Sequence, residues 1–154
     1  MKPLIVLISS FILAYIFILA FNIPGGYKFA GRIAMAGMLL FTAIGHFAFT
    51  KGMVMMIPPV IPFKKAIVYI TGVLEIAAAV CLLIPQYAEV IGWLLIAFFI
   101  LLIPANISAA MRKVDYQKGT YDGDDVSYLW FRVPLQALFI LWTYISTSLS
   151  ASIF

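Results

Sequence analysis

Five polar or ionisable residues lie inside long apolar segments, where such side chains are costly and rare. They are His46, Glu75, Asn106, Arg132 and Gln136. Imidazole and carboxylate groups can exchange protons, whereas guanidinium and amide groups donate hydrogen bonds to carbonyl or anionic oxygen atoms. This set is suited to binding the polar end of a small lipophilic molecule. The five residues are therefore a candidate ligand-binding polar cluster, and the pattern assigns no catalytic role to any of them.

The composition identifies the medium in which this cluster must lie. Of 154 residues, 65% are hydrophobic and 10% are charged, whereas a soluble domain has about 45–50% apolar and about 25% charged residues. So few charges cannot cover a surface that faces water. The composition therefore excludes a soluble globular protein, a disordered chain and a nucleic-acid-binding protein. We expect an all-α, polytopic helix bundle that forms a single membrane domain over residues 1–154, with the lipid bilayer as its main partner.

Five apolar segments are long enough for transmembrane helices, which need roughly 20 mostly apolar residues. The predicted helices span about residues 4–21, 33–49, 66–84, 90–110 and 128–149. The first segment follows a lysine, as a signal peptide would. Its apolar run is longer than the about 7–15 residues of a signal sequence, however, and no small-residue cleavage site follows it. We therefore expect an uncleaved transmembrane helix at residues 4–21.

Two connections between these segments are long, at residues 50–65 and 111–127. Pro58, Pro59 and Pro62 lie in the first and predict an extended path that does not cross the membrane, because proline lacks an N–H group and disfavours helix in the preceding residue. The second connection contains an acidic stretch at residues 121–125. It lacks the twelve-residue spacing and closing glutamate of a calcium loop, so we expect a solvated turn.

The distribution of lysine and arginine in the short loops predicts the orientation. Seven such residues lie on the side of the N-terminus, namely Lys2, Lys51, Lys64, Lys65, Arg112, Lys113 and Lys118. Two lie on the other side, namely Lys28 and Arg32. This asymmetry predicts a cytoplasmic N-terminus and a C-terminus outside the cytoplasm.

The depth of the five polar residues in their helices brings them together. Counted at about 1.5 Å of rise per residue, all five lie in the cytoplasmic half of the bundle, although they come from four helices. An isolated Glu75 carboxylate would be poorly solvated there, and Arg132 keeps its charge and offers five donors. We therefore expect a Glu75–Arg132 ion pair at the centre of the cluster. An architectural role stays open, because intramembrane polar contacts also hold helices together, at about 0.6–2 kcal/mol each.

The chain has one cysteine, Cys81, and one histidine, His46. A single cysteine excludes an internal disulfide, a CxxC pair and multi-cysteine zinc or iron–sulfur sites. A single histidine excludes bis-histidine haem ligation and two-histidine zinc motifs. We therefore predict no metal site.

Short motifs in a fixed order resemble the DoxX-like family of small bacterial membrane proteins. They are Gly45–His46–Phe47, Ile57–Pro58–Pro59, Tyr69-x-Thr71–Gly72-x-x-Glu75–Ile76, Leu82–Leu83–Ile84–Pro85, Pro104–Ala105–Asn106–Ile107 and Arg132–Val133–Pro134–Leu135–Gln136. The resemblance covers about residues 31–142 and marks the same five polar residues. It implies a four-helix core in the bacterial cytoplasmic (inner) membrane, to which this chain adds the helix at residues 4–21.

The resemblance also implies a link to quinone chemistry, because the family is named after a subunit associated with thiosulfate:quinone oxidoreductase. On this basis we expect an accessory or binding subunit whose pocket accepts a small lipophilic ligand such as a quinone, with a redox subunit as partner. Two alternatives stay open: a membrane subunit of a quinone-linked oxidoreductase in which Glu75 and His46 relay protons, or a purely structural or chaperone-like helix bundle. No nucleophile–base pair or nucleotide motif indicates an autonomous enzyme, and no other cofactor is evident.

Overall fold

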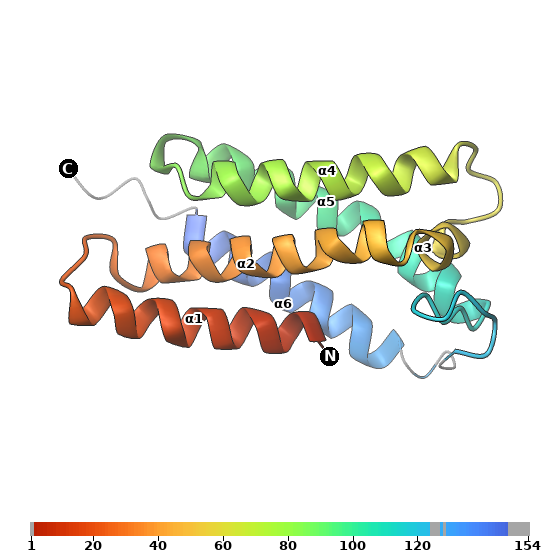
Figure 1. Cartoon of the computed structure of the whole chain (residues 1–154), viewed down its shortest axis with the longest axis horizontal. Coiled ribbons are helices and arrows are strands. Elements are labelled where there is room, and N and C mark those ends of the chain that lie inside the picture. Colours follow the sequence, from red (N-terminus) through yellow and green to blue (C-terminus); the bar gives the residue numbers. More distant parts are fainter. Residues whose placement is uncertain (1, 124–126, 128, 148–154) are drawn as a thin grey trace.

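The described residues, 2–123, 127 and 129–147 of a computed structural model, form an all-α bundle. Its six helices are α1 (Lys2–Ala20), α2 (Gly26–Ala48), α3 (Thr50–Met56), α4 (Lys64–Leu82), α5 (Pro85–Met111) and α6 (Leu129–Thr147). All except α3 are long and apolar enough to cross a membrane. These five helices lie side by side along the long axis of the molecule (Figure 1). The all-α class and the five candidate spans are thus confirmed.

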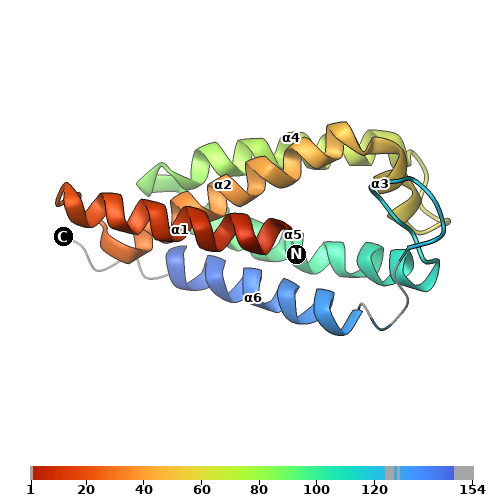
Figure 2. The same ribbon diagram turned by 60° about the horizontal axis from the view of Figure 1, so that its bottom comes forward.

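Helix α2 is the most buried of the five long helices. It packs against α1, α4 and α6, while α5 packs against α4 and α6. Buried alanines on α2, among them Ala30, Ala34 and Ala43, allow neighbouring helices to approach closely. Helices α4 and α6 lie on opposite sides of the bundle in both ribbon views (Figures 1 and 2). This order of helices decides which polar side chains can meet.

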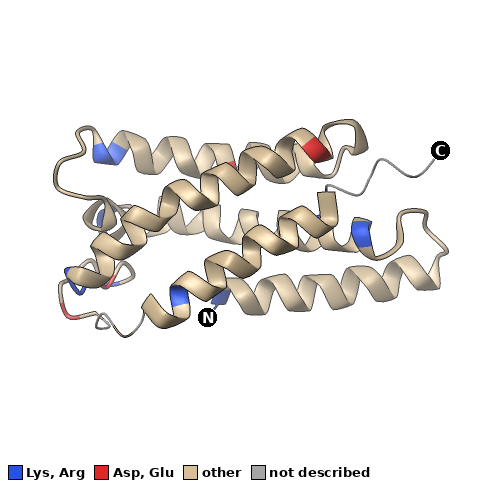
Figure 3. Cartoon of the chain, turned by 180° about the vertical axis from the view of Figure 1, so that it is seen from behind, with Lys and Arg blue, Asp and Glu red and all other residues tan. Residues whose placement is uncertain are grey.

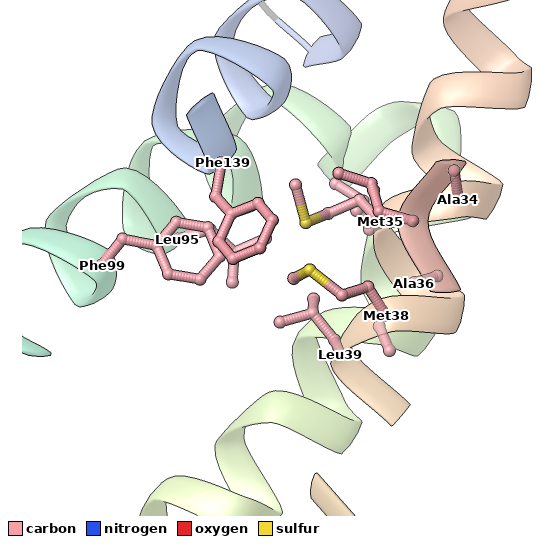
Figure 4. Packing of buried hydrophobic residues seen from close by; sticks show 11 residues of the cluster. Ala34, Met35, Ala36, Met38, Leu39, Leu95, Phe99 and Phe139 are labelled. Atoms are coloured by element: carbon pink, nitrogen blue, oxygen red, sulfur yellow. The ribbon is translucent and has the colours of Figure 1, made fainter. Parts of the chain in front are cut away.

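The apolar core lies where α2, α5 and α6 face one another. Met35 and Met38 of α2 point toward Phe99 of α5 and Phe139 of α6 (Figure 4). The two phenylalanine rings have centroids 6.0 Å apart. On the outside of the bundle, large apolar side chains such as Leu101 of α5 are exposed. Apolar residues therefore occupy both the core and the outer surface, as a lipid-facing bundle requires.

The connection at residues 50–65 differs from the predicted extended path. Its first half forms the short helix α3, and only residues 57–63 are non-helical. The prediction was wrong there because a proline restrains only the residue before it: Ile57, which precedes Pro58, is extended, and the residues upstream are free to form a helix. Helix α3 lies across one end of the bundle, against α4 and α5 (Figure 1).

Arg112, counted in the sequence only as a loop charge, joins α3 to the end of α5. Its Nη2 atom donates to the carbonyl oxygens of Met56 and Ile57, each at 3.0 Å, and to Ser108 Oγ at 2.8 Å. These carbonyl groups lie at the C-terminal end of α3, where a cation is favourable. Gly52 allows a second close contact of α3, because a Cβ atom there would overlap the backbone of Tyr116. Helix α3 is thus fixed against the loop that follows α5.

Helix α5 begins five residues before the predicted position. Pro85 occupies its first turn, where proline is well suited because its missing N–H would have no partner. In the loop after α5, Asp115 Oδ1 accepts hydrogen bonds from the backbone N–H groups of Lys118 and Gln117, which lower the pKa of that carboxyl group below its ordinary value. This supports the predicted turn as far as residue 123; residues 124–126 lie outside the described residues.

Candidate functional site

The five predicted residues form two groups rather than one cluster. His46 and Glu75 meet between α2 and α4, and we call them the imidazole–carboxylate pair. Asn106, Arg132 and Gln136 lie between α5 and α6, and we call them the α5–α6 polar group. The predicted ion pair between Glu75 and Arg132 is wrong, because the Glu75 oxygens contact His46 and Thr42 instead.

Every polar atom of the imidazole–carboxylate pair has a partner. Glu75 Oε1 lies 3.4 Å from His46 Nε2, and Glu75 Oε2 accepts a hydrogen bond from Thr42 Oγ1 at 2.9 Å. On the other side of the ring, His46 Nδ1 lies 2.9 Å from the carbonyl oxygen of Val68 and 3.1 Å from Thr71 Oγ1. Glu75 is 5% exposed. The pair is therefore a satisfied polar network inside the bundle.

The partners of the imidazole determine where its protons lie. A carbonyl oxygen can only accept, so His46 Nδ1 must carry a hydrogen and donate it to Val68. If Nε2 and Glu75 Oε1 both lacked a proton, their lone pairs would face each other, which is unfavourable. One proton must therefore lie between Nε2 and Oε1, held by either atom. In both cases the pair has no net charge, which makes its burial between α2 and α4 tolerable.

Close packing of α2 on α4 explains why Glu75 meets His46. Gly72 lies one turn before Glu75, and a Cβ atom at Gly72 would come within 2.8 Å of His46 Cβ. The absent side chain lets the imidazole lie directly against α4. Arg132 belongs to α6, on the opposite side of the bundle from α4. Depth along a helix, on which the prediction depended, does not specify which helices are neighbours.

The α5–α6 polar group has its own hydrogen bonds. Arg132 Nη1 donates to Asn106 Oδ1 at 3.4 Å, and Gln136 Nε2 donates to the carbonyl oxygen of Phe99 at 2.8 Å. The carbonyl of Phe99 lies one turn and a half before Pro104, inside α5. All three polar side chains therefore link α5 to α6 or face the space beside that interface.

A cavity of about 430 Å³ is lined by the α5–α6 polar group, whereas His46 and Glu75 are not among its lining residues. Asn106, Arg132 and Gln136 line one part of it, and Thr42, which bonds to Glu75, lines another. The rest of the lining is mostly apolar, including Phe41, Phe49, Met53, Met56 and Leu135. This size and this mixture of apolar wall and few polar groups are typical of small-molecule sites. The cavity is therefore a candidate site for a small, mostly apolar ligand.

A second, more polar cavity of about 450 Å³ lies at the α3 end of the bundle. Lys2, Arg132, Tyr116 and Gln117 line both cavities. Most of the lysine and arginine residues gather at this end of the molecule (Figure 3). The mostly apolar cavity thus lies next to a polar cavity whose lining has three basic residues, Lys2, Lys118 and Arg132, and two acidic residues, Asp115 and Asp122.

An apolar groove of about 380 Å³ separates α4 from α5 on the other side of Glu75. Leu74, Ala78, Leu94 and Phe98 are among its lining residues, together with Glu75 and the free Cys81. Glu75 therefore lies between this groove and the larger cavity. No group of three or more metal-ligating side chains occurs among the described residues.

Sequence reasoning missed two residues of the site. Thr42 lies four residues before His46, a spacing that puts both on one face of a helix and could have revealed it. Lys2 was counted only as an orienting charge, yet it lines both cavities. Arg32, predicted to flank the start of a helix, instead lies inside α2 and is 7% exposed, with its guanidinium carbon 5.4 Å from the centre of the Phe29 ring.

Comparison with known proteins gives one match. A family model described as a domain of unknown function, DUF8561, matches residues 35–147. This range is well over half of the chain and includes all five predicted site residues. No curated protein and no solved structure matches the chain.

Proposed function

The chain belongs to the DUF8561 family of domains of unknown function, and from its geometry we propose that it binds a small lipophilic ligand inside the membrane. The observation that carries this proposal is the cavity of about 430 Å³ lined by the α5–α6 polar group and by Thr42, which bonds to Glu75. Its apolar wall suits the body of such a ligand. Its few polar groups suit a ligand with one or two oxygen atoms.

A quinone is the ligand class that we favour. Arg132 and Gln136 line the cavity and carry donors for carbonyl oxygens. Phe41 and Phe49 provide aromatic surface for a ring. A lipophilic quinone could also enter from the bilayer, in which five helices of this chain are long and apolar enough to lie.

The resemblance to DoxX-like proteins supports a more specific role. We propose an accessory or binding subunit of the bacterial cytoplasmic membrane, with a four-helix DoxX-like core, α1 as an addition and a redox subunit as partner. A cytoplasmic N-terminus is part of this proposal. The α3 end, where most of the basic residues gather (Figure 3), would then face the cytoplasm.

A second candidate is a membrane subunit of a quinone-linked oxidoreductase that moves protons. The observation that favours it is the 3.4 Å contact between His46 Nε2 and Glu75 Oε1, next to Thr42, which lines the cavity. A group that can give up or take up a proton beside a quinone could assist its reduction. Loss of turnover with retained quinone binding in the Glu75→Gln variant would favour this candidate over a binding subunit.

Quinone binding by the purified protein tests the proposal. We expect quinone to co-purify from membranes, as read by its ultraviolet spectrum, and a decyl-substituted benzoquinone to bind the protein in lipid nanodiscs. The Arg132→Met and Gln136→Leu variants should bind this probe about tenfold more weakly, because each loses a donor in the cavity.

The matched control is Glu89→Gln, since Glu89 is an exposed residue of α5 outside the cavity lining. It should bind the probe as the wild type does. Circular dichroism should show unchanged helix content in every variant. A wild-type protein that does not bind the probe, or cavity variants that bind it as well as the control, would overturn the proposal.

A further inference from the structure

Thr42 touches both the imidazole–carboxylate pair and the cavity, and its single hydroxyl hydrogen has three acceptors within reach. Glu75 Oε2 lies 2.9 Å from Thr42 Oγ1, and the carbonyl oxygens of Leu39 and Met38 lie at 3.0 and 3.2 Å. A hydrogen bond to a carboxylate is the stronger choice. Whichever acceptor takes the hydrogen, it points into the helix interface. The hydroxyl can therefore offer a ligand only a lone pair.

The fixed orientation of the His46 ring preserves this acceptor-only character of the Thr42 hydroxyl. Val68 fixes the hydrogen on His46 Nδ1, so Nε2 always faces Glu75 Oε1 across the shared proton. If that proton moves to the carboxyl group, the Leu39 carbonyl still accepts the Thr42 hydrogen. The Thr42 hydrogen thus has an acceptor within the protein for both positions of the proton, and in both cases the hydroxyl can only accept from a ligand.

The other polar part of the cavity has the opposite character. Arg132 and Lys2 can only donate. Asn106 Oδ1 accepts from Arg132 Nη1, which leaves the Asn106 amide nitrogen as a donor. Gln136 also lines this part and keeps an acceptor oxygen, because its Nε2 atom donates to Phe99. Donors still predominate there, so this part of the lining suits an acceptor oxygen or an anionic group, whereas Thr42 suits a donor.

We propose that Thr42 is a specificity-determining residue, and that the ligand carries a hydroxyl or N–H donor at one end and a carbonyl or anionic oxygen at the other. This inference rests on the proposed ligand-binding function of the cavity and narrows it. Among quinone-like molecules, it selects a form that carries both a hydroxyl group and a carbonyl group, such as a hydroxyquinone, over a form with carbonyl groups alone.

Two probes that differ at one group test the inference. Both 4-hydroxyacetophenone and 4-methylacetophenone carry a carbonyl oxygen, but only the first carries a donor at the other end. Binding is measured by equilibrium dialysis against protein in lipid nanodiscs, with empty nanodiscs to correct for partition into lipid. The wild type should bind the hydroxyl probe about three- to tenfold more tightly than the methyl probe, as one neutral hydrogen bond allows.

Substitutions at Thr42 should change this ratio in a defined way. In Thr42→Val, which keeps the shape and removes the oxygen atom, the two probes should bind alike. Thr42→Ser should keep the preference. Thr71→Val is the matched control, because Thr71 contacts the same imidazole but does not line the cavity, and it too should keep the preference. If Thr42→Val does not fold, Thr42→Ala replaces it with the same expected result.

The outcomes separate this inference from the proposed function. Equal binding of both probes by the wild type, or an unchanged preference in Thr42→Val, would overturn the role of Thr42 while quinone binding stands. Binding of the decyl-substituted benzoquinone without either acetophenone would do the same. A wild-type protein that binds neither the quinone nor the acetophenones would overturn the proposed function and the inference with it.

Discussion

His46 and Glu75 show what a carboxyl group needs in order to be buried among apolar helices. Both oxygen atoms of Glu75 have hydrogen-bond partners, and the proton shared with His46 leaves the pair neutral. Arg132 is not required for this balance. It donates to Asn106 and lines both cavities. The charge of Glu75 is thus balanced by His46, and not by the ion pair with Arg132 that the residue types suggested.

A double-mutant cycle should detect this pairing. Glu75→Leu and His46→Leu should each lower the free energy of unfolding in detergent, and removal of one partner of a buried pair commonly costs about 3–5 kcal/mol. The Glu75→Leu/His46→Leu double variant should recover a large part of that loss, because no unpaired polar group is left. As a control, Glu75→Leu and Arg132→Met should have additive effects. Coupling of Glu75 to Arg132 instead of His46 would contradict the observed geometry.

Arg32 presents the opposite case, a buried cation with few partners. Its Nε and Nη1 atoms have no hydrogen-bond partner in the described part of the chain, and the Phe29 ring is its main contact. A buried, unsatisfied polar group costs about 1–3 kcal/mol. Arg32→Met, which keeps the length of the side chain, should therefore raise the thermal unfolding temperature. Lower stability of Arg32→Met would show that the guanidinium group makes a favourable interaction worth more than its burial costs.

The contact between α2 and α4 depends on a missing side chain. Gly72→Ala would gain up to about 1 kcal/mol of helix propensity, but its Cβ atom would lie 2.8 Å from His46 Cβ, which cannot move without the backbone of α2. We expect a net loss of about 1–3 kcal/mol, as is usual for overpacking. Thermal unfolding in detergent measures it.

Gly37 offers a matched control on α2. A Cβ atom there would meet only the hydroxyl end of Ser10, at 3.2 Å, and a serine side chain can rotate away. Gly37→Ala should therefore leave stability unchanged or raise it slightly through helix propensity. Equal effects of the two substitutions would mean that the close approach at Gly72 does not contribute to the helix contact.

Sequence reasoning predicted the helices well and their contacts poorly. Apolar runs of sufficient length identify membrane-spanning helices, because the bilayer leaves few other structures available. The five polar residues inside apolar runs were also easy to single out, because each is conspicuous there, whereas Thr42 and Lys2 were missed. The partners of the five were not found, because depth gives no rotation about the helix axis and no order of helices. Thr42 escaped notice because a threonine that bonds to its own helix, as Thr42 can to Leu39, resembles many structural threonines.

The molecule as a whole has two unlike ends. The α3 end contains Lys51, Lys64, Lys65, Arg112, Lys113 and Lys118, and it is closed by α3 and the loop after α5. The other end has only short connections, residues 21–25 between α1 and α2 and residues 83–84 between α4 and α5. Basic residues in short loops are retained on the cytoplasmic side of a membrane. The charge distribution therefore predicts that the α3 end faces the cytoplasm.

Single cysteines at the two ends should test this orientation. In a Cys81→Ser background, which removes the one native thiol, Val60→Cys places a thiol in the loop after α3 and Gln86→Cys places one at the start of α5. Both positions are exposed. A membrane-impermeant maleimide added to intact spheroplasts should label Gln86→Cys at once and Val60→Cys only after the membrane is permeabilised, because the basic end should face the cytoplasm. Cells that express the Cys81→Ser parent give the background signal. Labelling of Val60→Cys from outside, with Gln86→Cys protected, would show that the bundle has the reverse orientation. The polar cavity at the α3 end would then face the outer side, and a ligand with an anionic group would have to enter from there.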